Sequence, residues 1–291
     1  MELYKTYLTN LFEKIQMPQA AREVMLNALK KAWGEEFSSL LKIYDENYNI
    51  DYGALIEQMK VLSQKVGLHE YEGLLLLFLC LVPRLEKYYQ ERGYSQKMFD
   101  DIVKDLRYKA CECYGMHGIW GTFVPSWYHN IFRLKVVGFG KLQFMAQPFG
   151  CSYQGQGVVL TPESLIVFVH IPGTGSPLTR EDKAQAYREA KEFFQPLFGA
   201  GNKIPFATSS WLLFPRNKEF LKPTSNLYAF IEDFDIFEVT EYPNYDETWR
   251  LFGKAFTRWE DMPQDTSLQR AYIELIKRGE KTGKARGVFF L

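Results

Sequence analysis

The sequence predicts an α+β protein with two domains: an all-helical N-terminal domain in residues 1–130, and a mixed β-sheet with flanking helices in residues 131–291. Apolar side chains first recur with helical spacing, and the alternation typical of strands appears only later in the chain. Between the two patterns, residues 115–125 are rich in Gly, Trp and Pro, as in a linker or a corner between domains. This change of pattern is the main sign of two domains.

The longest apolar run, residues 74–82, falls within a predicted helix of the N-terminal domain. A membrane span needs about 20 apolar residues, so this shorter run predicts a buried helix. The chain opens at Met1 without a basic stretch followed by an apolar run, so no secretory signal is expected. We therefore predict a cytoplasmic protein with no membrane partner.

Charge and composition argue against some partner classes. Thirty-five basic residues balance thirty-five acidic ones, so no net charge attracts the chain to nucleic acid. Aromatic residues make up 16% of the chain, and such side chains fill cores and line clefts. The four cysteines are expected to be free thiols in the cytosol: Cys80, Cys111, Cys113 and Cys151.

The second domain is predicted as a succession of strands and helices. Residues 132–145 are expected to form a strand pair or one long bent strand, with Gly138 and Gly140 at a turn or bulge. Apolar strand-like runs and helical periods follow. They predict a strand at 164–170, a helix at 180–195, a strand at 206–214, a helix at 224–233, a strand at 234–242, helices at 247–259 and 267–278, and a strand at 284–291.

The most informative segment is the glycine-rich turn between the strand at 164–170 and the helix at 180–195. A turn of this kind is suited to phosphate, because glycine lets the backbone approach and the helix start carries partial positive charge. Up to four consecutive backbone N–H groups could face a ligand, from Gly173, Thr174, Gly175 and Ser176. We therefore predict phosphate binding there; the alternative is a loop that only turns the chain.

Five short motifs follow one another along the chain. They are Phe139-Gly140-Lys141-Leu142-Gln143-Phe144, Val169-His170-Ile171-Pro172, Ala190-Lys191-Glu192-Phe193-Phe194, Ser210-Trp211-Leu212-Leu213 and Ser225-Asn226. In these motifs the chain resembles an uncharacterised bacterial family that joins a helical N-acyltransferase N-terminal domain to a GNAT-like C-terminal domain. The resemblance implies a GNAT-like sheet. It also implies transfer of an acyl group, with acetyl as the first expectation, from acetyl-CoA or another acyl-CoA to an amine of a small molecule or peptide.

The chain differs from ordinary GNAT enzymes at two positions. Their pyrophosphate turn begins with Arg or Gln, where this chain has His170, although both glycines of the turn are kept. Their next helix often carries Asn-x-x-Ala-x-x-x-Tyr; Asn226 and Ala229 fit, but Asp233 replaces the tyrosine that protonates the leaving thiolate. The coenzyme A contacts implied by the resemblance come from Gly173, Thr174, Gly175, Ser176, Arg180 and Asn226.

Acyl transfer to an amine needs a base, support for an oxyanion and an acid for the thiolate. By the resemblance, the thioester lies beside the strand that ends at His170, which could act as the base or bind the pantetheine arm. Glu238 is a second candidate base, provided that its strand partly buries it on the face it would share with Ile236. Tyr228 is the predicted acid that protonates the leaving thiolate, and Tyr242 is the other candidate tyrosine for this role. The structural alternatives are a histidine bonded to a backbone carbonyl and a solvated carboxylate.

Two functions remain open from the sequence. The first is acyl-CoA-dependent transfer to an amine. The second, favoured by the changed residues His170 and Asp233, is a non-catalytic ligand-binding or interaction protein on a degenerate acetyltransferase scaffold. A metal site is not expected, because Cys111 and Cys113 are closer in sequence than the cysteine pairs of structural zinc sites.

Overall fold

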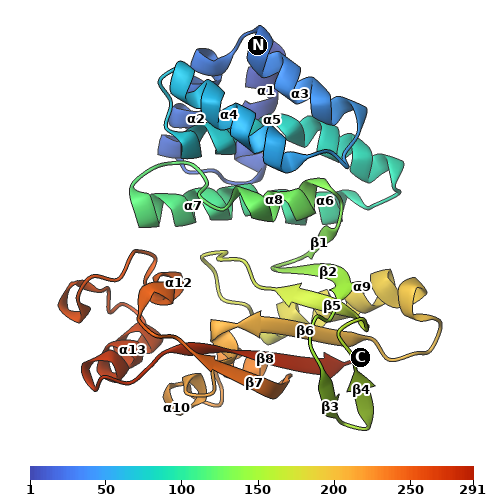
Figure 1. Cartoon of the computed structure of the whole chain (residues 1–291), viewed down its shortest axis with the longest axis vertical. Helices are drawn as coiled ribbons and strands as arrows, with labels where there is room; N and C mark the ends of the chain where they lie inside the picture. Colours follow the sequence, from blue (N-terminus) through green and yellow to red (C-terminus); the bar gives the residue numbers. More distant parts are fainter. The chain divides into compact units, whose positions relative to one another are not determined.

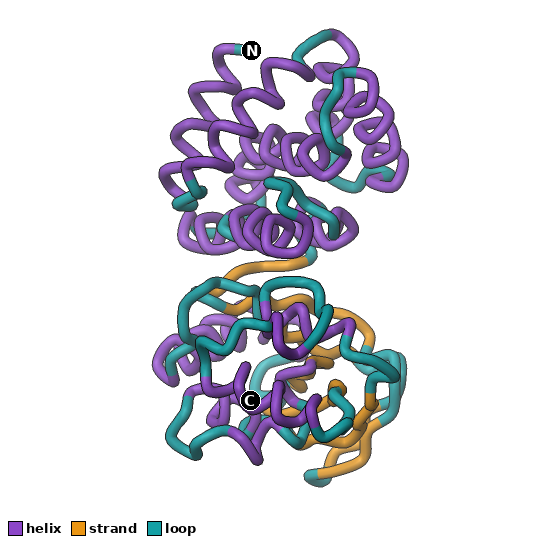
Figure 2. The backbone as a smooth tube through the Cα atoms, turned by 90° about the vertical axis from the view of Figure 1, so that its left-hand side faces the viewer, coloured by secondary structure: helices purple, strands orange, loops and turns teal.

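The computed structural model describes all 291 residues and divides into two compact units, Met1–Gly138 and Phe139–Leu291. Figure 1 shows helices throughout the first unit, and a sheet with flanking helices in the second. The tube view shows no strand before β1 (Figure 2). The predicted α+β fold class is therefore confirmed.

The first unit is organised around one central helix, α5 (Glu70–Glu91), which packs against every other helix of the unit. All residues from Leu74 to Val82 are buried, as expected of a core helix. No helix of the chain combines the length and the apolar composition that a membrane span requires. The other helices are α1 (Glu2–Lys14), α2 (Gln19–Ala32), α3 (Glu35–Glu46), α4 (Tyr52–Lys65), α6 (Gln96–Val103), α7 (Asp105–His117) and α8 (Pro125–Phe132).

Six strands form one sheet in the order β1-β2-β5-β6-β8-β7 (Figure 1). The pair β5–β6 is parallel, whereas β2–β5, β6–β8 and β7–β8 are antiparallel. A separate hairpin of β3 (Tyr153–Gly155) and β4 (Val158–Leu160) lies between β2 and β5 in sequence. The sheet strands are β1 (Val136–Phe139), β2 (Leu142–Pro148), β5 (Leu165–His170), β6 (Pro205–Ser210), β7 (Asp235–Glu241) and β8 (Gly283–Phe290).

Helices connect the strands of this sheet. The crossover from β5 to β6 contains α9 (Arg180–Phe198), which packs on β2 and on α11 (Asn226–Ile231). The remaining short elements are η1 (Trp211–Leu213), α10 (Asn217–Phe220), η2 (Asp246–Thr248), α12 (Trp249–Phe252) and η3 (Trp259–Asp261), and the last helix is α13 (Ser267–Lys277).

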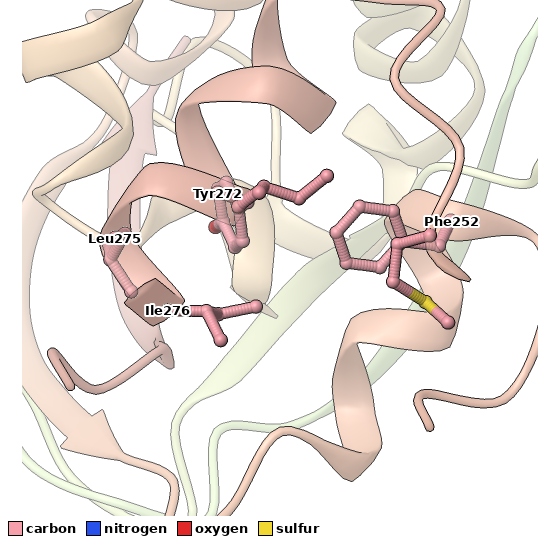
Figure 3. Packing of buried hydrophobic residues seen from close by; sticks show 6 residues of the cluster. Phe252, Tyr272, Leu275 and Ile276 are labelled. Carbon is pink, nitrogen blue, oxygen red and sulfur yellow. The ribbon is translucent and has the colours of Figure 1, made fainter. Parts of the chain in front are cut away.

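The helix predicted at 247–259 is wrong. Helix α12 ends at Phe252 because Gly253 adopts a left-handed conformation, with φ of 70°, and closes the helix. The chain from β7 to β8 instead forms a compact insertion with its own small core. Ile276 extends from α13 towards Phe252 (Figure 3). The buried members of this core are Phe252, Met262, Tyr272, Ile273, Leu275 and Ile276.

Candidate active site

The two parallel strands β5 and β6 separate before they end. Their register includes only Val167 opposite Phe206 and Phe168 opposite Ala207. Each strand stays paired with its neighbour on the other side: β5 pairs with β2 as far as His170, and β6 pairs with β8 as far as Ser210. The sheet is therefore split between the carboxyl ends of β5 and β6, which is where open sheets with parallel strands bind ligands.

A cavity of about 440 Å³ lies at this split. Its wall comes from the ends of β5, β6 and β7, the start of β8 and the insertion between β7 and β8. Most of the side chains are polar, so the cavity suits a ligand rich in hydrogen-bonding groups. The lining residues are Phe168, His170, Ile171, Thr208, Ser209, Ser210, Trp211, Leu212, Tyr242, Glu247, Arg250 and Lys284.

Of the three predicted catalytic residues, His170 lines this cavity. It is the last residue of β5, is half-buried, and its Nε2 atom is shielded from solvent. Ser209 faces it across the split, from β6, and its hydroxyl makes no hydrogen bond within the protein. Ser210, in contrast, is occupied locally, because its Oγ accepts from the Leu212 N–H at 3.2 Å. His170 and Ser209 thus line the same cavity from the two strands that separate there.

Tyr242 brings a phenol into the cavity from the end of β7. Burial raises the pKa of this hydroxyl above its ordinary value, the nearby carboxylate of Glu247 raises it further, and the Arg250 guanidinium lowers it. Glu247 and Arg250 pair with each other, with Nε and Oε2 3.1 Å apart. Tyr242 is therefore protonated at neutral pH and can donate a proton.

Lys284 is a cation of the cavity wall that forms no hydrogen bond or ion pair within the protein. It stands on β8 opposite Thr240 of β7. Glu247, Arg250 and Lys284 were not predicted from the sequence. They belong to no sequence motif. Glu247 and Arg250 lie in the insertion between β7 and β8, and only the folding of this insertion brings them to the same cavity as Lys284 of β8.

The glycine-rich turn leaves fewer donors for a ligand than the predicted four. The Thr174 N–H donates to the carbonyl of Pro172 at 2.9 Å, and the Ser176 N–H donates to the Thr174 hydroxyl at 3.3 Å. The N–H groups of Gly173 and Gly175 have no partner in the protein. The turn can therefore present two backbone donors to an anion.

The start of α9 is capped by the protein itself. Thr179 Oγ1 accepts from the Asp182 N–H at 3.1 Å, and Asp182 Oδ2 accepts from the Thr179 N–H at 3.2 Å, forming the predicted capping box. Lys141 Nζ lies 2.8 Å from Asp182 Oδ2, and this hydrogen bond lowers the pKa of Asp182. Arg180, beside the cap, is exposed, and its Nη2 reaches the carbonyl of Pro223 at 3.4 Å. The guanidinium of Arg180 is thus accessible to an anion bound at the turn.

Asp233, which stands where ordinary GNAT enzymes have a tyrosine, has a structural role. Its Oδ2 lies 2.5 Å from Lys183 Nζ and accepts from the Tyr187 hydroxyl at 3.3 Å. Lys183 also donates to the carbonyl of Ala229 at 2.9 Å, so these bonds join α9 to α11. Burial raises the pKa of Asp233, while Lys183 opposes that shift.

The other predicted residues lie outside the cavity wall. A bulge at Phe237 moves Glu238 off the face of Ile236, since Ile236 stands opposite Gly287 and Glu238 opposite Arg286. The condition of partial burial is therefore not met: the carboxylate of Glu238 is exposed and pairs with Arg286 at 3.1 Å, which agrees with the alternative of a solvated carboxylate. Tyr228 and Asn226 lie on α11 and are half-buried, and neither lines the cavity.

Two family models together cover the chain. Residues 6–134 match an N-acyltransferase N-terminal domain, and residues 136–289 match a GNAT-like C-terminal domain. The chain belongs to this acyltransferase family. The resemblance expected from the sequence is thereby confirmed, and both descriptions agree with the predicted enzyme class, an N-acyltransferase. A comparison with curated protein sequences finds no match.

Solved acyltransferase structures share the fold. One, an acyltransferase in complex with decanoyl-CoA and teicoplanin, has a TM-score of 0.77 and 20% identity over 97% of this chain and 87% of the other. A mutant acyltransferase in complex with octanoyl-CoA gives a TM-score of 0.76, with the same identity and coverage. These neighbours bind the class of co-substrate that the sequence predicts.

No group of three or more His, Cys, Asp or Glu side chains is placed to hold a metal ion. Cys113 is buried and Cys111 is exposed, although both lie on α7.

Proposed function

We propose that this protein transfers an acyl group from acyl-CoA to an amine, with the thioester held in the split between β5 and β6. The observation that carries the proposal is the polar cavity of about 440 Å³ at the point where the two parallel strands separate. The N-acyltransferase description of residues 6–134 supports an amine as the acceptor. The pyrophosphate would lie at the N–H groups of Gly173 and Gly175, near the Arg180 guanidinium.

In this reaction the amine nitrogen attacks the thioester carbonyl carbon, a C–N bond forms, and the C–S bond breaks. His170, on the cavity wall, takes the proton from the amine, and Ser209, on the same wall, donates a hydrogen bond to the oxyanion. The thiolate of coenzyme A then takes the proton of Tyr242, which its environment keeps protonated; the phenolate regains a proton from solvent, and the proton taken from the amine is released to solvent. The products are an amide and coenzyme A.

Coenzyme A and acyl-CoA are expected to stabilise the protein against heat. A ligand present at 100 times its dissociation constant adds about 2.7 kcal/mol, which raises the melting temperature by about 5 °C. Ser209→Trp fills the split from β6 and should abolish this shift. Leu197→Trp, at an exposed position of α9, is the control and should keep it.

Release of free thiol in the presence of an amine panel then separates the two functions. Thiol release that depends on both acyl-CoA and an amine supports the transferase. Stabilisation by coenzyme A without thiol release favours the non-catalytic binding protein. The absence of any shift with coenzyme A or acyl-CoA contradicts the proposal.

A further inference from the structure

A second, smaller cavity of about 140 Å³ adjoins the split, and its wall combines apolar and polar surface. It shares Phe168, Thr208 and Ser209 with the larger cavity, so the two meet at the proposed position of the thioester. Its other lining residues are Gln147, Phe149, Cys151, Ile166, Ala207, Phe237 and Arg286.

The apolar part of this wall comes from one face of the sheet and from the β3–β4 hairpin region. The core of this region contains Ile166 and Ala207 on the sheet and Tyr153 on the hairpin. Phe149, Phe168 and Phe237 pack against that core but are only partly buried. Their rings thus leave apolar surface facing the cavity, which an apolar ligand can cover.

The walls of the second cavity are held in place. The chain leading into the hairpin is fixed by the Phe149 N–H, which donates to the backbone carbonyl of Ser164 at 2.9 Å. The hairpin itself is fixed to β7 by the Tyr153 hydroxyl, which donates to Asp235 Oδ2 at 2.6 Å. The β-bulge in β7 turns Phe237 to this side, where its ring centroid lies 5.7 Å from that of Phe149. The cavity is therefore part of the fold and lies between fixed elements.

We infer that this cavity takes the acyl chain of the thioester, and that the protein prefers chains of about six carbons to acetyl, since a cavity of about 150 Å³ lined by apolar side chains holds a six-carbon ring. The inference rests on the proposed function, because the thioester must lie at the split for its chain to enter here. Pantetheine and acceptor then occupy the larger cavity, while the hydrocarbon tail lies against the partly buried phenylalanine rings of the smaller one. Acetyl would leave the second cavity unfilled.

Calorimetric titration with coenzyme A, acetyl-CoA, hexanoyl-CoA and decanoyl-CoA tests the inference. Hexanoyl-CoA is expected to bind at least about tenfold more tightly than acetyl-CoA, because each buried methylene adds affinity. Decanoyl-CoA should gain nothing further over hexanoyl-CoA. Equal affinity for acetyl-CoA and hexanoyl-CoA would overturn the inference and leave the proposed function intact, whereas no binding of coenzyme A would overturn the proposed function itself.

Two substitutions should move the chain-length preference in opposite directions. Ala207→Leu narrows the second cavity and should remove the higher affinity for hexanoyl-CoA over acetyl-CoA. Cys151→Leu, at a half-buried position of the same wall, should have the same effect and replaces Ala207→Leu if that variant does not fold. Phe149→Ala widens it and should extend the gain to longer chains. Val158→Ala trims the same core outside the cavity wall and should keep the wild-type profile.

The thiol of Cys151 provides a second readout that is independent of activity. In a Cys111→Ser background the remaining cysteines, Cys80 and Cys113, are buried. Saturating hexanoyl-CoA should slow alkylation of Cys151 at least about fivefold more than coenzyme A does, since only the acyl chain fills the cavity beside it. Equal protection by both would place the chain elsewhere and overturn the inference.

Discussion

Tyr242→Phe is expected to lower kcat about 100-fold while changing KM for acyl-CoA little. The substitution removes only the hydroxyl oxygen from the cavity wall, so binding surface is kept and the proposed proton donor is lost. Tyr245→Phe is the matched control: Tyr245 lies in the same insertion, and its hydroxyl donates to the Glu280 carbonyl at 3.0 Å outside the cavity wall. Single-turnover rates with the two variants provide the comparison. An unchanged rate for Tyr242→Phe would remove Tyr242 from the reaction.

The pH dependence of the same reaction follows from the environment of Tyr242. An acid catalyst must be protonated, so activity falls as pH rises through its pKa. Burial and Glu247 raise that pKa above the ordinary tyrosine value of about 10, and the alkaline decline of the wild type should lie above it. Glu247→Gln removes a negative charge and should move the decline to lower pH. A decline that stays in place when kcat is measured against pH would contradict this role.

Much of the second unit could be predicted from the sequence because its signals are local. The apolar run before Pro172 makes β5, and the capping box of Thr179 and Asp182 starts α9 within the chain itself. These signals locate the turn and the strand end at His170. They do not reveal that the Thr174 hydroxyl accepts from a neighbouring N–H, since that bond depends on the conformation of the turn.

The rest of the candidate site could not be predicted, because it depends on pairing between distant segments. Glu238 was placed by simple alternation, and one extra residue at Phe237 moved it to the other face. Glu247 and Arg250 reach the cavity only because Gly253 ends α12 and the chain folds back into the insertion. The ion pair of Asp233, the residue that replaces the tyrosine of ordinary GNAT enzymes, with Lys183 could not be predicted either, because the two residues are distant in sequence.

The insertion that supplies Tyr242, Glu247 and Arg250 is joined to the end of β6 by one buried amide. Asn217 is fully buried; its Nδ2 donates to the carbonyls of Trp211 and Leu212 at 2.8 and 2.9 Å. Its Oδ1 accepts from the Tyr272 hydroxyl of α13 at 2.5 Å. Trp211 and Leu212 both line the cavity, so this amide holds the cavity wall to the core of the insertion.

Asn217→Ala is therefore expected to destabilise the second unit by about 3 kcal/mol, because two carbonyls and a buried phenol lose their partner together. Tyr272→Phe removes one of these bonds and should cost about 1.5 kcal/mol. Hydrogen exchange of the full chain, followed in residues 210–221 and 267–278, measures the loss locally, and about 3 kcal/mol corresponds to roughly 100-fold faster exchange. Asn226→Ala, on a helix of the same unit without a comparable buried bond, is the control. If Asn217→Ala speeds exchange in only one of the two segments, the amide does not join them, and the wall of the cavity is held by packing and by the Arg216–Glu280 ion pair instead.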